Sequence, residues 1–221
     1  MTTKKSAQSP KPRSRSAREK PETRKRLLVE ATIRCLGRGG LSAFTIDQIC
    51  REAKVARGLI NHYYKSKDDL LISVYETMTQ YMAQATQELA EDTSLSREER
   101  ITRIIEANFD AQAFDPATLR AWLALWGEIP TNPDLKKFQQ DRYLAFRDCM
   151  AQTFEDLARE RGRDVNGTNL AMKLIAFFDG LWIQWCIEPN SITPEKAKAA
   201  CFELIETELG SIAHTVNRRP T

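Results

Sequence analysis

The sequence predicts an all-α protein in which a small helix-turn-helix unit precedes a larger helical domain. Three observations predict this class. Apolar residues recur at helical spacing from residue 21 onward, and no segment alternates apolar and polar residues as a strand would. Two short helical segments follow one another across a tight connection at Lys54 and Val55. Capping residues or prolines stand at the starts of most expected helices.

The first expected helix covers residues 22–38. Leu28, Ala31 and Cys35 fall at the spacing of one buried helix face, and Gly39 with Gly40 ends the helix. Two capping boxes then mark new starts, because Thr45 precedes Gln48 by three residues and Ser66 precedes Asp69 by three. The pattern therefore predicts short helices over 46–53 and 56–64 and a long helix over 67–91.

The rear of the chain is expected to contain five more helices. Pro116, Pro133 and Pro194 each occupy a plausible first turn, where the missing amide hydrogen costs nothing. The expected ranges are 96–113, 116–126, 133–161, 167–187 and 194–213. The predicted organisation is a disordered basic arm over 1–20, a helix-turn-helix domain over 21–66 and a larger helical domain over 67–214.

The charge is divided unevenly along the chain. Residues 1–67 carry 17 Lys and Arg against 5 Asp and Glu, whereas residues 68–221 carry 16 against 25. The basic front is suited to meeting a polyanion. Because seven of these basic residues lie in the arm, a merely solvating tail explains part of the excess. Residues 21–67 nevertheless hold ten basic residues against four acidic ones.

The third expected helix carries side chains that could read DNA. Ile60 and Tyr64 are four residues apart and should face inward, which leaves the others to project outward. Arg57 can bond to guanine, Asn61 to adenine, and Leu59 can contact a thymine methyl. An ordinary helical hairpin has the same spacing. The full candidate DNA-binding set is Thr45, Arg57, Gly58, Leu59, Asn61, His62, Tyr63, Lys65 and Lys67.

The composition argues against several other classes. The five cysteines form no CxxC pair, which argues against a disulfide framework or a structural zinc site and favours a reducing cytoplasm. No secretory signal is evident, and Asp179 and Gln184 interrupt the longest apolar run, so no membrane role is expected. With two histidines and no nucleophile motif, an enzyme is disfavoured, and no metal or cofactor is expected.

Residues 44–71 resemble the signature of the TetR family of transcriptional regulators. The agreement lies in "FTIDQICREAKVARGLINHYYKSKDDLL", which matches at about a dozen fixed positions. Ala56 departs from the family pattern, which usually has Ser or Thr as the cap of this helix. Loss of such a cap costs about 1 kcal/mol, so this helix start is expected to be less rigid.

The rear half resembles one branch of that family, which includes the choline-responsive repressor of glycine betaine synthesis genes. The resemblance lies in "NFD", "AWLALW", "NPDL", "QQDRYLAFR" and "FFDGLWIQW". It implies a subunit of about nine helices, in which 21–66 form a DNA-binding domain and 67–214 a ligand-binding and dimerisation domain. It also implies a palindromic double-stranded DNA operator, a small-molecule effector, and a homodimer held by the last two helices. Gly180 would permit a close approach of helices there.

Aromatic and acidic residues of the rear half form the candidate effector site. Trp122 and Trp126 share one helix face, as do Trp182 and Trp185. Tryptophans with a carboxylate suit a quaternary ammonium ion through cation–π attraction. Core and interface packing explains the same residues, and an apolar or drug-like effector of an efflux or catabolic regulator would use the same tryptophans. The candidate ligand-binding set is Phe109, Asp110, Trp122, Trp126, Asp179 and Trp182.

Two other function classes remain open on the sequence alone. A helical enzyme would turn over its ligand, and a nucleoid or adaptor protein would use the basic arm without preference for a sequence. The leading interpretation is a ligand-responsive repressor, in which an effector biases the separation of two recognition helices.

Overall fold

The computed structural model describes residues 21–110 and 115–212, and within these ranges the chain folds into nine α-helices and one short 3₁₀ turn, without a strand. The α-helices are α1 (Pro21–Gly39), α2 (Ile46–Ala53), α3 (Arg57–Tyr63), α4 (Lys67–Glu91), α5 (Arg97–Ala107), α6 (Pro116–Glu128), α7 (Pro133–Glu160), α8 (Gly167–Ile187) and α9 (Pro194–Leu209). The all-α prediction is confirmed. Residues 1–20, predicted to be a basic arm, lie outside the described residues.

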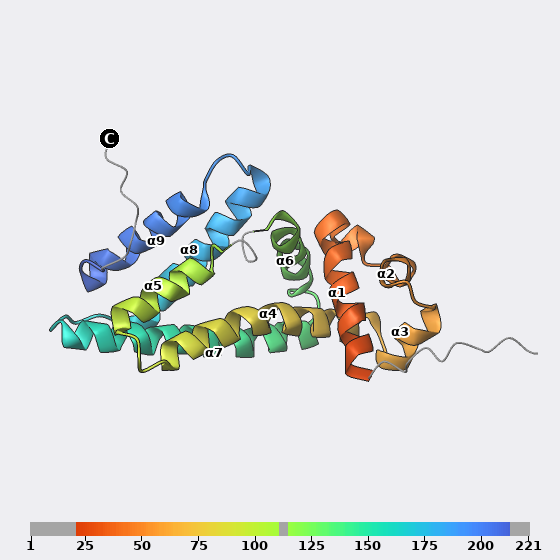
Figure 1. Ribbon diagram of the computed structural model, residues 1–221, viewed down its shortest axis with the longest axis horizontal. Coiled ribbons are helices and arrows are strands. Elements are labelled where there is room, and N and C mark those ends of the chain that lie inside the picture. The colour runs from red at the N-terminus through yellow and green to blue at the C-terminus, as the bar shows by residue number, and fades with distance from the viewer. Residues whose placement is uncertain (1–20, 111–114, 213–221) are drawn as a thin grey trace, which may run out of the picture.

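The helices form an elongated subunit (Figure 1). Helices α1 to α3 lie together at one end, and the two long helices α4 and α7 pack along each other. Helix α8 packs on α7, and α9 packs on α8. Helix α6 is short and lies between α1 and the rest of the rear domain.

Local capping explains where several helices begin. The Thr45 hydroxyl accepts from the amide of Gln48, and the Ser66 hydroxyl accepts from the amide of Asp69, as predicted. Asn132 and Thr193 cap the helices that start with Pro133 and Pro194. These side chains satisfy amides that would otherwise lack a partner in the first turn.

Two predicted helix ends were placed too late. Helix α5 ends at Ala107, not near residue 113, because the Asn108 side chain turns back and donates to the Ile104 carbonyl. Helix α9 ends at Leu209, before Gly210, which has a φ of +80°. The Gly40–Ala43 turn was not predicted; it begins at Gly40, whose φ of +58° favours glycine.

Residues of the front domain belong to the one buried core that runs through the subunit. Ile49 and Ala53 of α2 pack with Ile60 of α3 and with Tyr64, and all four are buried. The inward direction predicted for Ile60 and Tyr64 is therefore confirmed. Lys54 in the connection adopts a left-handed conformation with a φ of +56°, which turns the chain sharply from α2 into α3. Ala56 provides no side-chain cap for α3.

The front domain is joined directly to the rear domain through α1 and α6. A Cβ atom added to Gly37 would lie 2.6 Å from the carbonyl oxygen of Ala117, so only glycine allows this approach of the two backbones. Arg120 of α6 also donates through Nε to the Gly37 carbonyl at 2.6 Å. A displacement of α6 would therefore act on α1 without a flexible connection between them.

Helix α8 is long and apolar enough, by length and composition alone, to cross a membrane. One of its faces contributes Leu170, Leu174 and Phe178 to the buried core, and Asp179 follows directly. That pattern is typical of a core helix in a helical bundle. Its opposite side, including Met172 and Ile187, is exposed in the isolated subunit.

Candidate functional site

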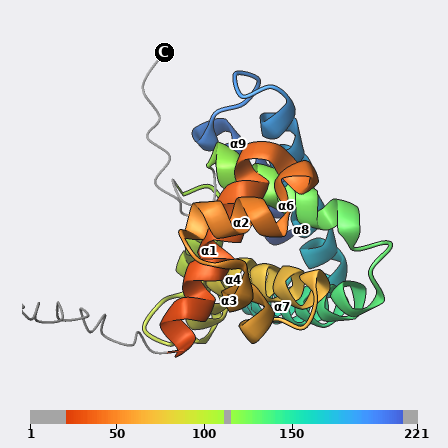
Figure 2. The same cartoon turned by 90° about the vertical axis from the view of Figure 1, so that its right-hand side faces the viewer.

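The predicted DNA-reading residues lie on the outer side of the helix-turn-helix. Arg57, Asn61 and His62 of α3 are exposed, and Leu59 and Tyr63 are half-buried. Figure 2 shows this end of the molecule facing the viewer, with α2 and α3 in front of the rear domain. A Cβ atom on Gly58 would meet no atom within 4 Å. The chain itself therefore does not require glycine there, which is consistent with a close approach to an outside partner.

The Arg57 side chain forms one weak surface ion pair. Its Nη2 atom lies 3.6 Å from the carboxylate of Asp47 on α2, and both side chains are largely exposed. Such a surface ion pair contributes about 0–1 kcal/mol. Arg57 can therefore exchange this partner for a base edge at little cost.

The other residues of the candidate DNA-binding set lie around that surface. Thr45 lies at the start of α2 and Lys67 at the start of α4, and both are exposed. The Lys67 ammonium lies 4.6 Å from the centre of the Phe44 ring, a cation–π contact that positions it. Lys65 is exposed beside it, and the rings of His62 and Tyr63 meet edge to face at 4.9 Å.

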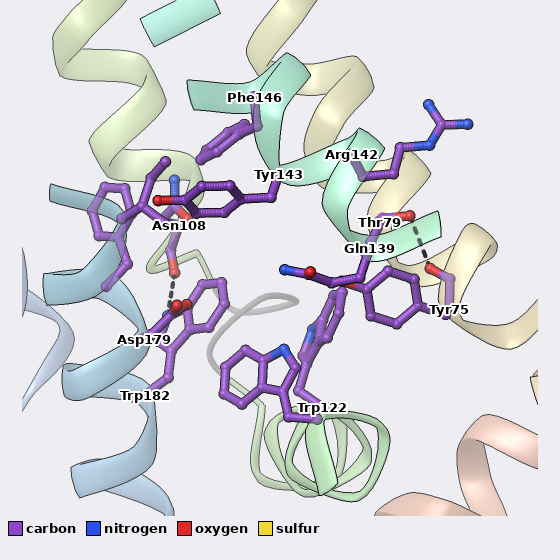
Figure 3. A pocket seen from close by; sticks show the side chains of 13 residues that line it. Tyr75, Thr79, Asn108, Trp122, Gln139, Arg142, Tyr143, Phe146, Asp179 and Trp182 are labelled. Carbon is purple, nitrogen blue, oxygen red and sulfur yellow. Dashed lines mark hydrogen bonds between the residues drawn. The ribbon is translucent and has the colours of Figure 1, made fainter. Parts of the chain in front are cut away.

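The rear domain contains a cavity of about 120 Å³ between α4, α6, α7 and α8. It is several times the volume of about 30 Å³ that a water molecule occupies in the liquid, so a small organic molecule fits. Figure 3 shows its side chains converging from these helices. The described lining residues are Tyr75, Thr79, Asn108, Trp122, Trp126, Gln139, Arg142, Tyr143, Phe146, Ile175, Phe178, Asp179 and Trp182.

Three tryptophans form a continuous aromatic wall in this cavity. The Trp122 and Trp126 rings are 5.9 Å apart, and Trp126 stacks on Trp182 at 6.4 Å with an interplanar angle of 12°. Tyr75 meets Trp122 edge to face at 5.5 Å. The Trp182 indole nitrogen donates to the backbone carbonyl of Asn108 at 3.1 Å, which fixes the orientation of its ring.

Asp179 supplies the only carboxylate among the described lining residues. Burial raises its pKa from 3.8 to about 6, and no neighbouring charge in the described chain offsets that effect. Burial, and to a lesser extent the charge of Asp179, also raises the pKa of Tyr75. Arg142 is the one cation among the lining residues that the structure describes, but its guanidinium is exposed above Phe138 and points away from the other labelled side chains (Figure 3). The carboxylate thus lacks a compensating cation from the described chain.

The structure brings four of the six predicted ligand-binding residues together. Trp122, Trp126, Asp179 and Trp182 all line the cavity. Phe109 does not; it is buried against Phe178, with ring centres 5.7 Å apart.

Asp110 is half-buried and also lies outside the lining, so the structure does not support grouping it with Asp179. The sequence analysis also predicted that helix α5 continues past Asp110 to residue 113. A helix continuing to residue 113 would have carried Asp110 on its surface, whereas the chain leaves the helix at Asn108.

Sequence reasoning missed the contributions of α4 and α7. Tyr75, Gln139, Tyr143 and Phe146 line the cavity, yet none was predicted to bind ligand because their spacing is that of ordinary helix faces. The last three were noticed only as part of "QQDRYLAFR". Asn108 was noticed only as part of "NFD". Its position before a helix end would have been the available signal.

Comparisons with known proteins identify the family of this chain. Residues 97–210 match the family described as "BetI-type transcriptional repressor, C-terminal". Residues 28–74 match "Bacterial regulatory proteins, tetR family". The chain belongs to the TetR family. It is a ligand-responsive, DNA-binding transcriptional repressor of the BetI type, as the sequence predicted.

Curated relatives match over almost their whole length. The regulator BetI 1 of Chromohalobacter salexigens is 29% identical over 206 residues, which is 90% of this chain and 95% of that protein. The regulator BetI of Escherichia coli K12 is 28% identical, over 84% of this chain and 94% of that protein. The family assignment therefore extends across both domains.

Solved structures share the fold. A transcriptional regulator from Pseudomonas aeruginosa PAO1 aligns with a TM-score of 0.77 and 32% identity, over 88% of this chain and 94% of its own. A regulator from Saccharomonospora viridis, solved in complex with choline, aligns with a TM-score of 0.73 and 23% identity, over 84% of this chain and 96% of its own.

Proposed function

We propose that the effector of this repressor is choline or a closely related quaternary ammonium compound. The observation that carries this proposal is the meeting of three tryptophans and one uncompensated carboxylate in a single cavity. A quaternary ammonium ion has no N–H donor. It is therefore recognised by aromatic faces and by a nearby negative charge rather than by directional hydrogen bonds to nitrogen.

The expected affinity is moderate. Each well-placed ring contributes about 0.5–2 kcal/mol to binding of a cation. Two or three rings with one carboxylate then correspond to a dissociation constant in the micromolar to millimolar range, after the cost of immobilising the ligand. The names of the curated BetI relatives and the choline complex of the Saccharomonospora viridis regulator support the same ligand class.

The signal from the effector is proposed to pass through α6. Trp122 and Trp126 lie on this helix, and its other side holds α1 through Arg120 and the Gly37 contact. Ligand that moves the tryptophans therefore biases the position of the helix-turn-helix. In a dimer, this changes the separation of the two recognition helices, which must match half-sites about one helical turn apart on a palindromic operator.

The dimer is proposed to form through α8 and α9. Met172, Ile183 and Ile187 are exposed apolar residues on α8, and a Cβ atom on Gly180 would meet no atom within 4 Å, which leaves room for a partner helix. Phe178 and Trp182 of α8 and Ile205 of α9 are buried within the subunit core. The interface is therefore expected to use the opposite side of α8.

The relatives of this chain are transcriptional regulators. We infer that the protein has no catalytic activity, binds no membrane and works in the cytoplasm. Turnover of choline on incubation with the purified protein would contradict the first of these inferences.

Calorimetry on three variants tests the effector. Trp126→Ala should weaken choline binding at least tenfold, and Asp179→Asn should do so as well, because each removes one part of the cation site. Asp110→Asn is the matched control, since this carboxyl lies outside the cavity lining. An apolar effector would lose affinity with Trp126→Ala alone. No choline binding by the native protein up to several tens of millimolar would refute the ligand class and leave the repressor assignment standing.

A further inference from the structure

The side-chain carbonyl of Asn108 is a buried acceptor without a partner. Asn108 is 2% exposed, and its Nδ2 donates to the Ile104 carbonyl at 2.8 Å. Its Oδ1 has no hydrogen-bond partner among the described residues. A flipped amide would set Oδ1 against the Ile104 carbonyl, and two acceptors repel. The orientation of this carbonyl is therefore fixed by α5 itself.

Asn108 is also part of the cavity wall. Its backbone carbonyl accepts from the Trp182 indole, so the residue is tied to the aromatic wall on one side and to α5 on the other (Figure 3). Two other buried polar atoms in the described chain lack a hydrogen bond, on Arg97 and Thr102, and neither residue lines the cavity. Asn108 is thus distinguished by its place beside Trp182 and Asp179.

An unpartnered buried acceptor on a residue that lines a binding cavity has a direct chemical meaning. Buried polar groups in folded proteins are almost always hydrogen-bonded, because leaving one unpaired is costly. Asp179 attracts a positive charge, whereas Asn108 Oδ1 can accept only from an O–H or N–H group. The cavity therefore offers two different recognition elements, one for a cation and one for a hydrogen-bond donor.

We propose that Asn108 Oδ1 accepts a hydrogen bond from a hydroxyl group of the effector. This inference rests on the proposed quaternary ammonium ligand and narrows it. The effector class is a quaternary ammonium ion that carries a hydroxyl group on a short arm, with the charged head on the tryptophans and the hydroxyl on Asn108. Asn108 is then the residue that sets specificity within that class.

The same arrangement rejects the oxidised analogue. Glycine betaine has the same trimethylammonium head but carries a carboxylate in place of the hydroxymethyl group. Its carboxylate oxygens are acceptors and cannot donate to Asn108 Oδ1, and their negative charge is repelled by Asp179. Binding of glycine betaine is therefore disfavoured at both residues. A repressor built in this way distinguishes an alcohol from its acid although the cationic heads are identical.

Calorimetry with three ligands on the native full-length protein tests the inference. The ligands are choline, ethyltrimethylammonium, which has the same head but no hydroxyl, and glycine betaine. Choline should bind about tenfold or more tightly than ethyltrimethylammonium, because only choline satisfies the buried acceptor. Glycine betaine should bind more weakly than both.

Asn108→Leu then removes the acceptor while keeping the size of the side chain. In this variant the preference for choline over ethyltrimethylammonium should fall to less than about threefold. Asn169→Leu, on an exposed part of α8 outside the cavity, should keep the native preference. If Asn108→Leu does not fold, the ratio in the native protein still decides the matter.

The outcomes separate this inference from the ligand class on which it rests. Equal binding of choline and ethyltrimethylammonium by the native protein would overturn the role of Asn108 and leave the cation site intact. If Asn108→Leu keeps the native preference for choline over ethyltrimethylammonium, the role of Asn108 is likewise overturned and the cation site is left intact. Failure of all three ligands to bind would overturn the proposed ligand class and this inference together.

Discussion

Replacing Asp179 with asparagine should stabilise the ligand-free protein and at the same time weaken its response to choline. Burial raises the pKa of Asp179 to about 6, so its charged form is disfavoured in the folded state. An acid whose pKa is higher when folded than when unfolded penalises folding as the pH rises through the folded value. The penalty is absent below about pH 4 and complete above about pH 6–7. Asparagine removes it.

The size of the effect follows from the shift. A change from 3.8 to about 6 is roughly two units, and each unit corresponds to about 1.4 kcal/mol. This gives an upper bound of about 3 kcal/mol. Because the side chain is only half-buried, solvent screening reduces the expected gain to about 1–2 kcal/mol. For a chain of this length, that is a rise of about 2–8 °C in the unfolding midpoint.

Thermal unfolding at pH 7.5 and at pH 4.5, with and without choline, measures both effects. At pH 7.5 the ligand-free Asp179→Asn protein should melt above the native protein, and at pH 4.5 the difference should become small. Choline at a hundred times its dissociation constant should stabilise the native protein by about 2.7 kcal/mol and the variant much less. A variant that melts lower at pH 7.5, or that retains the full choline shift, would refute this account of Asp179.

Three further predictions concern binding and coupling. The dissociation constant for choline should be about tenfold higher at pH 5 than at pH 8, because protonation with a pKa of about 6 removes the charge of Asp179. A dissociation constant that stays the same across this pH range in calorimetry would contradict this prediction. Arg57→Ala should relax base preference at a cost of about 1–3 kcal/mol at one base pair, whereas Lys67→Ala should weaken binding to all DNA sequences alike. Fluorescence anisotropy at several salt concentrations, on operator and on random DNA, measures both effects. A reversed pattern would refute the assignment. Gly37→Ala should lower the unfolding midpoint, because its Cβ atom would lie 2.6 Å from a backbone oxygen of α6. Gly127→Ala should not lower it, because a Cβ atom there would meet no atom within 4 Å. Equal midpoints for the two variants would show that α1 and α6 do not pack this tightly.

Local signals were sufficient for the fold of the front domain. The N-caps Thr45 and Ser66 and the inward pair Ile60 and Tyr64 depend on neighbours within four residues, and the structure confirms them. The reciprocal half of the predicted capping box at Ser66 is not formed as expected, because the Asp69 carboxylate accepts from the amide of Lys65 rather than from that of Ser66. Helix ends were harder to predict. Whether Asn108 continues or ends a helix depends on its side chain competing for the Ile104 carbonyl, which helical periodicity does not reveal.

The effector cavity could be predicted only in part. Trp122 and Trp126 share a helix face, so their proximity is a local property. Their meeting with Trp182, and with Tyr75 of α4, depends on how distant helices pack. The choice between the two acids also depended on packing, because Asp179 faces the cavity from within a helix whereas Asp110 follows a helix end.

The most direct test of the central claim is a crystal structure of the protein grown with saturating choline. The account predicts the trimethylammonium group within about 6 Å of the ring centres of Trp122, Trp126 or Trp182, with the carboxylate of Asp179 nearby and the hydroxyl on Asn108. Choline bound elsewhere, or a cavity without ligand under conditions in which calorimetry shows saturation, would contradict it.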